Sequence, residues 1–152
     1  GRLPILDSLR RQSRAVLIPE EKVNQAALGR IAQYAREQSP SDSFFLVPPA
    51  WGRFRILAGR ALFFSWKGVP KQEQAMLLWR QRLVDGFGLP EGRSYAPGEL
   101  EGLYRGIRDP KLLWLREKYG ITHAVLPHGT PTRMRVLFNE GSFLVVEIGG
   151  GP

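Results

Sequence analysis

The stretch Ser43-Phe44-Phe45-Leu46-Val47-Pro48-Pro49 decides the fold, because it joins a short apolar run to an abrupt stop. A run of this length between turn residues is typical of a buried strand. Proline has no backbone N–H to donate to a sheet ladder, so the strand is expected to end before Pro48. The sequence therefore predicts a buried strand followed directly by the loop Ala50-Trp51-Gly52.

Working outward from this strand, a helix is expected on its N-terminal side and a second strand on its C-terminal side. Pro19 opens the helix, and Ser39-Pro40 ends it. The second strand is the apolar run Ala61–Ser65. Between the two strands, Phe54–Ala58 fits either a strand or one helical turn, and the pattern leaves both readings open.

The middle of the chain is expected to be helical on both sides of a long glycine-rich loop. Pro70 marks the start of a helix that runs to Val84, and the loop extends from Gly86 to Gly98. A second helix is indicated by the helical spacing of Leu100, Leu103, Tyr104 and Ile107. Asp109-Pro110 begins a third helix, which ends at Gly120.

The C-terminal part is expected to supply three further strands, at residues 121–126, 133–138 and 143–148. Asn139-Glu140-Gly141-Ser142 predicts a hairpin between the last two. Strands separated by helices indicate a parallel core. We therefore expect a single α/β domain over residues 1–152. The predicted architecture is a three-layer sandwich with a mostly parallel core sheet and a C-terminal antiparallel hairpin. Residues 1–18 are a possible lead-in segment and residues 149–152 a flexible tail.

Composition excludes several classes of protein. Hydrophobic residues make up 43% of the 152 positions, which is too many for a disordered chain. No apolar run approaches the roughly 18 residues that a membrane span requires. Without cysteine, neither a disulfide nor a thiolate site can form. The net charge of +8 favours polyanionic neighbours such as nucleic acid, anionic lipid or phosphate-bearing ligands.

The densest group of candidate ligand-binding residues follows the first two predicted strands. Ligands of open α/β sheets collect outside the carboxyl ends of the strands, where these side chains would converge. Arginine and indole groups together suit a phosphate, a carboxylate or a sugar ring. The alternative is that the indoles are packed and the cations solvated. The candidates are Trp51, Arg53, Arg55, Arg60, Trp66 and Lys67.

His128 completes the candidate set, because it follows the third predicted parallel strand and would lie near the same edge. It could serve as a general base, although the spacing implies no partner and an exposed loop residue is the plainer interpretation. His123 lies within the strand and is expected to be packed in the core. The two histidines make a poor metal pair, and the acidic residues are scattered. We therefore assign no catalytic residue, metal or cofactor.

Several segments together resemble a known type of domain. They are residues 43–49 (SFFLVPP), 54–67 (FRILAGRALFFSWK), 115–125 (LREKYGITHAV) and the hairpin 136–148 (VLFNEGSFLVVEI). The whole is similar to the soluble C-terminal domain of bacterial polytopic membrane proteins related to type C glycosyltransferases, some of which form a family of unknown function. The resemblance covers roughly residues 40–148, and its most specific part is residues 54–67.

This resemblance implies an extracytoplasmic domain at the bacterial inner membrane, attached to a transmembrane region of the same chain that carries the transferase chemistry. Since the sequence starts at Gly1, we expect upstream transmembrane helices. The expected function is a non-catalytic accessory or ligand-binding domain in envelope glycan or lipid metabolism, with anionic lipid or a lipid-linked phosphate as partner. The alternatives are a small enzyme that acts on a phosphorylated or anionic substrate, and a nucleic-acid-binding domain. Nucleic acid is the less favoured partner because no nucleic-acid-binding motif is present.

Overall fold

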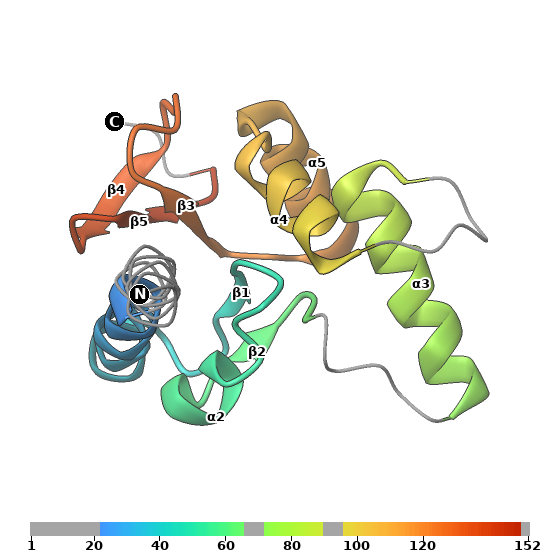
Figure 1. Cartoon of the computed structure of the whole chain (residues 1–152), viewed down its shortest axis with the longest axis horizontal. Coiled ribbons are helices and arrows are strands. Elements are labelled where there is room, and N and C mark those ends of the chain that lie inside the picture. Colours follow the sequence, from blue (N-terminus) through green and yellow to red (C-terminus); the bar gives the residue numbers. More distant parts are fainter. Residues whose placement is uncertain (1–21, 66–71, 90–95, 150–152) are drawn as a thin grey trace, which may run out of the picture.

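The computed structural model describes residues 22–65, 72–89 and 96–149. Within these ranges the chain forms a mixed α/β fold around one five-stranded sheet, in the order β2-β1-β3-β5-β4 (Figure 1). β1 is parallel to both β2 and β3, whereas β5 is antiparallel to β3 and β4. The predicted parallel core and antiparallel C-terminal hairpin are therefore confirmed. The strands are β1 (Phe44–Leu46), β2 (Ala61–Leu62), β3 (His123–Pro127), β4 (Arg135–Asn139) and β5 (Phe143–Glu147).

The helices lie close to where the sequence predicts them. A helix over residues 22–38 precedes β1 and ends before Ser39-Pro40. The ambiguous segment after β1 is a single short helix, closed by Gly59 at φ 64°. Gly120 closes the last helix in the same left-handed conformation, at φ 82°. The labelled helices are α2 (Phe54–Ala58), α3 (Glu73–Phe87), α4 (Pro97–Arg105) and α5 (Asp109–Tyr119).

The order of the strands creates a crevice between β1 and β3. From β1 the chain passes through α2 to β2, its neighbour on one side. From β2 it returns through α3, α4 and α5 to β3, on the other side of β1. Ligands of open α/β sheets bind at such a switch point, outside the carboxyl ends of the two strands.

Alternate side chains of the strands build two apolar clusters on opposite faces of the sheet, as the period of a strand requires. Phe45 and Val125 pack with the helix of residues 22–38 and with α2. Leu46 and Ala124 pack with α3, α4 and α5 on the other face. Figure 1 shows the two groups of helices on either side of the strands. Both faces of the central strands are therefore covered, which explains why they read as continuous apolar runs.

Two glycines of the predicted long loop belong to helices instead, Gly98 in the first turn of α4 and Gly86 in α3. Gly86 is buried near the end of α3, and a Cβ atom there would lie 3.0 Å from a ring carbon of Phe63. The missing side chain lets α3 approach the chain just beyond β2. Gly86 therefore marks close packing rather than a turn, and the connection after α3 is shorter than predicted. The predicted lead-in segment lies outside the described residues, as does the predicted tail apart from Gly149.

Candidate functional site

A pocket of about 660 Å³ opens at the switch point. Pro48, which follows β1, and Pro127, at the end of β3, line it together with Phe143 at the start of β5. The loop after β1, the first helix and α4 supply the other lining residues. The described lining residues are Asn24, Gln25, Leu28, Pro48, Ala50, Trp51, Arg53, Glu101, Tyr104, Arg105, Pro127 and Phe143. We call this hollow the switch-point pocket.

The loop after β1 gives the pocket its aromatic wall. Trp51 is 5% exposed, and its ring meets the ring of Phe143 edge-on with the centroids 4.9 Å apart. Two backbone bonds shape this loop, from Trp51 N–H to the carbonyl of Pro48 at 2.9 Å and from Phe54 N–H to the carbonyl of Trp51 at 3.0 Å. Trp51 is therefore both part of the core and part of the pocket lining.

Glu101 ties this loop to α4. One carboxylate oxygen of Glu101 accepts a hydrogen bond from the N–H of Ala50 at 2.9 Å. Burial raises the pKa of Glu101, although the Ala50 N–H and the nearby Arg105 guanidinium oppose that rise. The carboxylate has a fixed structural contact and sets the position of the loop relative to the helix.

Tyr104, which also lines the pocket, carries an unusual polar group. Its side chain is 2% exposed, and within the described part of the chain its hydroxyl has no hydrogen-bond partner. Burial raises the pKa of Tyr104 well above its ordinary value, with the Glu101 charge as a smaller cause, so the hydroxyl keeps its proton. Leaving a buried hydroxyl without a partner costs about 1–3 kcal/mol. A residue that bears this cost beside a pocket points to a partner from outside the chain.

Two cations flank the pocket. Arg53 lies just before α2, and Arg105 is the last residue of α4. Both are exposed, and neither side chain makes a hydrogen bond or an ion pair with another residue in the described ranges. Arg105 interacts with the Glu101 charge only electrostatically, so both guanidinium groups keep their N–H donors for a phosphate or a carboxylate.

The other predicted arginines do not join Arg53 in this pocket. Arg55 lines a separate hollow of about 290 Å³ beside α3. Arg60 lies where the first helix and α2 end, and its guanidinium donates to the Ser39 hydroxyl and to four carbonyl oxygens, those of Arg36, Ser39, Ala58 and Gly59. Arg36 donates in turn to the carbonyls of Ile56 and Leu57 in α2. We call this arrangement the arginine corner; it satisfies the carbonyls that both helix ends leave free.

The remaining predicted residues lie elsewhere. Trp66 and Lys67 fall outside the described residues. His128 is exposed on the loop after β3 and is not among the described residues that line the switch-point pocket. His123 is 6% exposed and stacks on Phe45 with the ring centroids 4.7 Å apart, which confirms the predicted packed histidine. Its Nδ1 lies 2.7 Å from the hydroxyl oxygen of Thr122.

Sequence reasoning missed the residues that α4 brings to the pocket, namely Glu101, Tyr104 and Arg105. It interpreted this helix only as an amphipathic element, whose apolar stripe includes Tyr104. One signal was present: Glu101 and Arg105 are four residues apart and so share a helix face, with the hydroxyl-bearing Tyr104 beside them. That signal identifies a polar edge on the helix, but not the loop after β1 that faces it.

Comparison with known proteins gives one partial similarity. Residues 26–85 are similar to a family described as a domain of unknown function, DUF6798. This segment includes Trp51 and Arg53 but ends before α4, so it covers only part of the pocket lining. No curated protein and no solved structure matches the chain.

Two features of the described residues bear on the class of site. None of the described helices combines the length and the apolar character that crossing a membrane requires. The same residues contain no group of three or more histidine and acidic side chains placed to hold a metal ion. The switch-point pocket is therefore described by its cations, its aromatic wall and its buried hydroxyl.

Proposed function

We propose that the switch-point pocket binds an anionic organic ligand, of which a sugar phosphate is the best-fitting class. The observation that carries this proposal is the Tyr104 hydroxyl, buried and without a partner in the described part of the chain, beside a pocket flanked by Arg53 and Arg105. The arginines suit the phosphate, and the Trp51–Phe143 wall suits the face of a sugar ring. Asn24 and Gln25 add side-chain amides that suit sugar hydroxyls.

The lining favours binding over acid–base chemistry. Among the described lining residues Glu101 is the one carboxylate, and it already accepts a hydrogen bond from Ala50. General acid–base catalysis needs a donor and an acceptor placed on either side of a reacting bond. The alternative of an enzyme that uses His128 receives no support from the exposed position of that residue.

In its wider context, we propose that the chain is the accessory or ligand-binding domain of a bacterial membrane protein in envelope glycan or lipid metabolism, on the extracytoplasmic face. The resemblance of residues 40–148 to tail domains of proteins related to type C glycosyltransferases supports this proposal, and a pocket for a phosphate-bearing ligand agrees with it. We also propose the three-layer sandwich as the finer description of the fold, on the basis of the two apolar clusters. Upstream coding sequence with several apolar stretches of about 20 residues is the expected gene context.

Calorimetric titration of the 152-residue chain tests the ligand class. The probes are a hexose 1-phosphate, the free hexose and inorganic phosphate. We expect the hexose phosphate to bind more tightly than either of its parts, and Arg53→Ala to weaken that binding. Equal binding of inorganic phosphate and hexose phosphate would mean that the aromatic wall contributes nothing. Preferential, salt-sensitive binding of random DNA would replace the proposal with the nucleic-acid alternative.

A further inference from the structure

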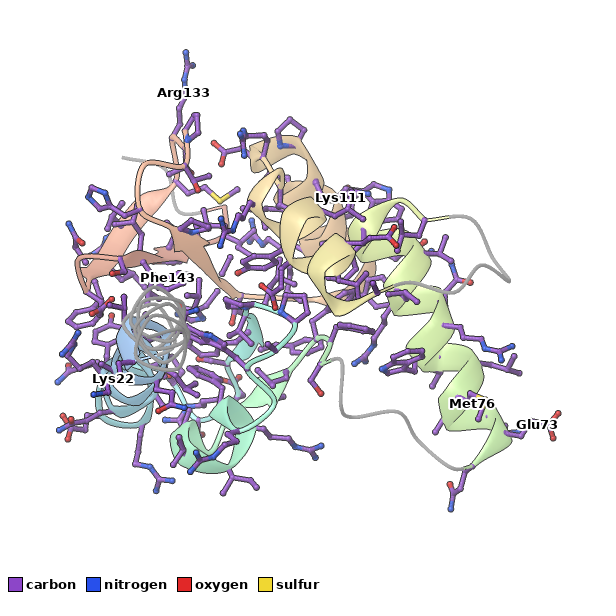
Figure 2. All side chains as sticks on the ribbon, in the orientation of Figure 1. Lys22, Glu73, Met76, Lys111, Arg133 and Phe143 are labelled. Atoms are coloured by element: carbon purple, nitrogen blue, oxygen red, sulfur yellow. The ribbon has the colours of Figure 1, made fainter. Side chains whose placement is uncertain are left out.

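The two halves of helix α3 differ in how far their apolar side chains are exposed. Its C-terminal half is buried, with Leu83 at 8% and Phe87 at 7% exposure. Its N-terminal half carries Leu77 at 58% and Leu78 at 62% exposure. Figure 1 shows this half projecting away from the sheet, and Figure 2 shows Glu73 and Met76 at its outer end. Two adjacent leucines are thus presented to the surroundings on a projecting helix.

The half-buried Trp79, the neighbour of the two leucines, anchors α3 to the segment after β2. The Trp79 ring stacks on Phe64 with the centroids 5.1 Å apart, and its Nε1 donates to the carbonyl of Ser65 at 3.2 Å. These contacts set the rotation of the helix. Leu78 then lines the hollow of about 290 Å³ that also contains Arg55 of α2. The exposed apolar residues therefore lie beside a cation from another helix.

Two arginines accompany the two leucines, since Arg55 shares a hollow with Leu78 and Arg80 lies about one helical turn after Leu77. Arg55 and Arg80 are both exposed. In the described residues from 53 to 80, Glu73 is the one acidic side chain. We call Arg55, Leu77, Leu78 and Arg80 the tip surface. Exposed leucines flanked by arginines are the combination found on protein surfaces that lie in the interface of anionic membranes.

We propose that the tip surface docks on an anionic lipid bilayer, with Leu77 and Leu78 entering the acyl boundary and the two arginines meeting lipid phosphates. A stable protein–protein interface uses about 20–30 residues on each side, far more than this projecting patch offers. A lipid surface needs only a few apolar side chains and nearby cations. The inference rests on the proposed membrane context, but it does not depend on a ligand in the switch-point pocket.

Vesicle co-sedimentation of the 152-residue chain tests the proposal. The vesicles contain either phosphatidylcholine alone or phosphatidylcholine and phosphatidylglycerol in equal amounts. We expect binding to the mixed vesicles, weakened by high salt, and much weaker binding to phosphatidylcholine alone. The double substitution Leu77→Gln/Leu78→Gln should lower the affinity about tenfold, because glutamine keeps the helix propensity but not the apolar surface. Arg55→Gln/Arg80→Gln should lower the affinity for the mixed vesicles about tenfold and remove the preference for them.

Leu113→Gln is the matched control, because Leu113 is 46% exposed in the middle of α5 and the substitution is the same. It should bind vesicles like the unchanged chain. The leucine variants should still bind the hexose phosphate, and Arg53→Ala should still bind vesicles, so the two proposals fail separately. Unchanged vesicle binding by the leucine double variant would overturn the docking proposal. So would a dimer of the unchanged chain that this variant makes monomeric, since a second copy would then cover the leucines.

Discussion

The arginine corner and the switch-point pocket contain similar side chains that the fold uses in opposite ways. In the corner, every bond of the Arg60 guanidinium goes to the chain's own oxygen atoms. In the pocket, the Arg53 and Arg105 guanidinium groups have no such partner in the described residues. The difference teaches that a cation near a strand end indicates a ligand site only when its hydrogen-bond partners within the chain are known. The corner should matter for stability, and the pocket for binding.

The largest expected effect is on the corner. Arg60→Ala removes hydrogen bonds from a charged donor to the ends of two helices, and should lower the free energy of unfolding by about 2 kcal/mol. Chemical denaturation with a two-state fit measures this change. Hexose phosphate binding at a temperature where the variant is folded should stay unchanged. A drop in hexose phosphate affinity without a loss of stability would indicate that Arg60 binds the ligand and does not stabilise the corner.

In the pocket, Arg53→Ala and Arg105→Ala should have the opposite pattern, with an effect on binding and little effect on stability. Each should weaken binding of the hexose 1-phosphate about tenfold, because each removes a charge-assisted bond to the anion. The free energy of unfolding should stay within about 0.5 kcal/mol, as is usual for exposed side chains. Arg55→Ala is the matched control for the titration, since Arg55 is two residues away and lines a different hollow. An equal loss with Arg55→Ala would mean that general surface charge binds the ligand.

Tyr104→Phe tests whether the unpartnered Tyr104 hydroxyl forms a hydrogen bond with the ligand. Removing a buried group that has no partner should raise the stability of the unliganded chain by about 1 kcal/mol. The same substitution should weaken binding of the hexose 1-phosphate, so stability and affinity should change in opposite directions. Thermal unfolding with and without ligand measures both. A loss of stability in the unliganded chain would indicate that the hydroxyl already has an internal partner.

The smallest expected effect concerns His123, at the other end of the central strands. Burial lowers the pKa of His123, with the Glu147 charge opposing. Below the ordinary histidine pKa of about 6.5 the unfolded chain binds a proton that the folded chain does not, so stability should fall as the pH drops through this range. His123→Phe should reduce this slope while keeping the stacking on Phe45. His128→Gln, in the exposed loop, is the control, and denaturation at several pH values is the measurement.

Much of the fold could be predicted because strands and helices are encoded locally. A few residues are enough to predict β1 from its apolar run and the start of α5 from Asp109-Pro110. Phe54–Ala58 stayed ambiguous because five residues are too few to show a helical or an alternating period. Gly86 was assigned to a loop because its role, the close approach of α3 to Phe63, depends on a residue 23 positions away.

The site could be predicted only where one strand end determines it. Trp51 and Arg53 follow β1 directly, so the switch-point rule placed them near the pocket. The same rule could not separate Arg53 from Arg60, since the partners of Arg60 come from the end of another helix. Nor could it find Tyr104, whose side chain reaches the pocket only because α4 packs beside the loop after β1.

The pairing of β1 with β3 also has a consequence for how the chain is made. Phe44 bonds to Thr122, 78 residues later, and Phe45 is in register with His123. At synthesis rates of 5–20 residues per second, β1 waits about 4–16 s for its central partner. Among the described strands, the two-residue β2 is the one neighbour that has been made by then. A nascent chain that stalls before His123 therefore leaves one edge of its most apolar strand unpaired, open to chaperones or to another copy.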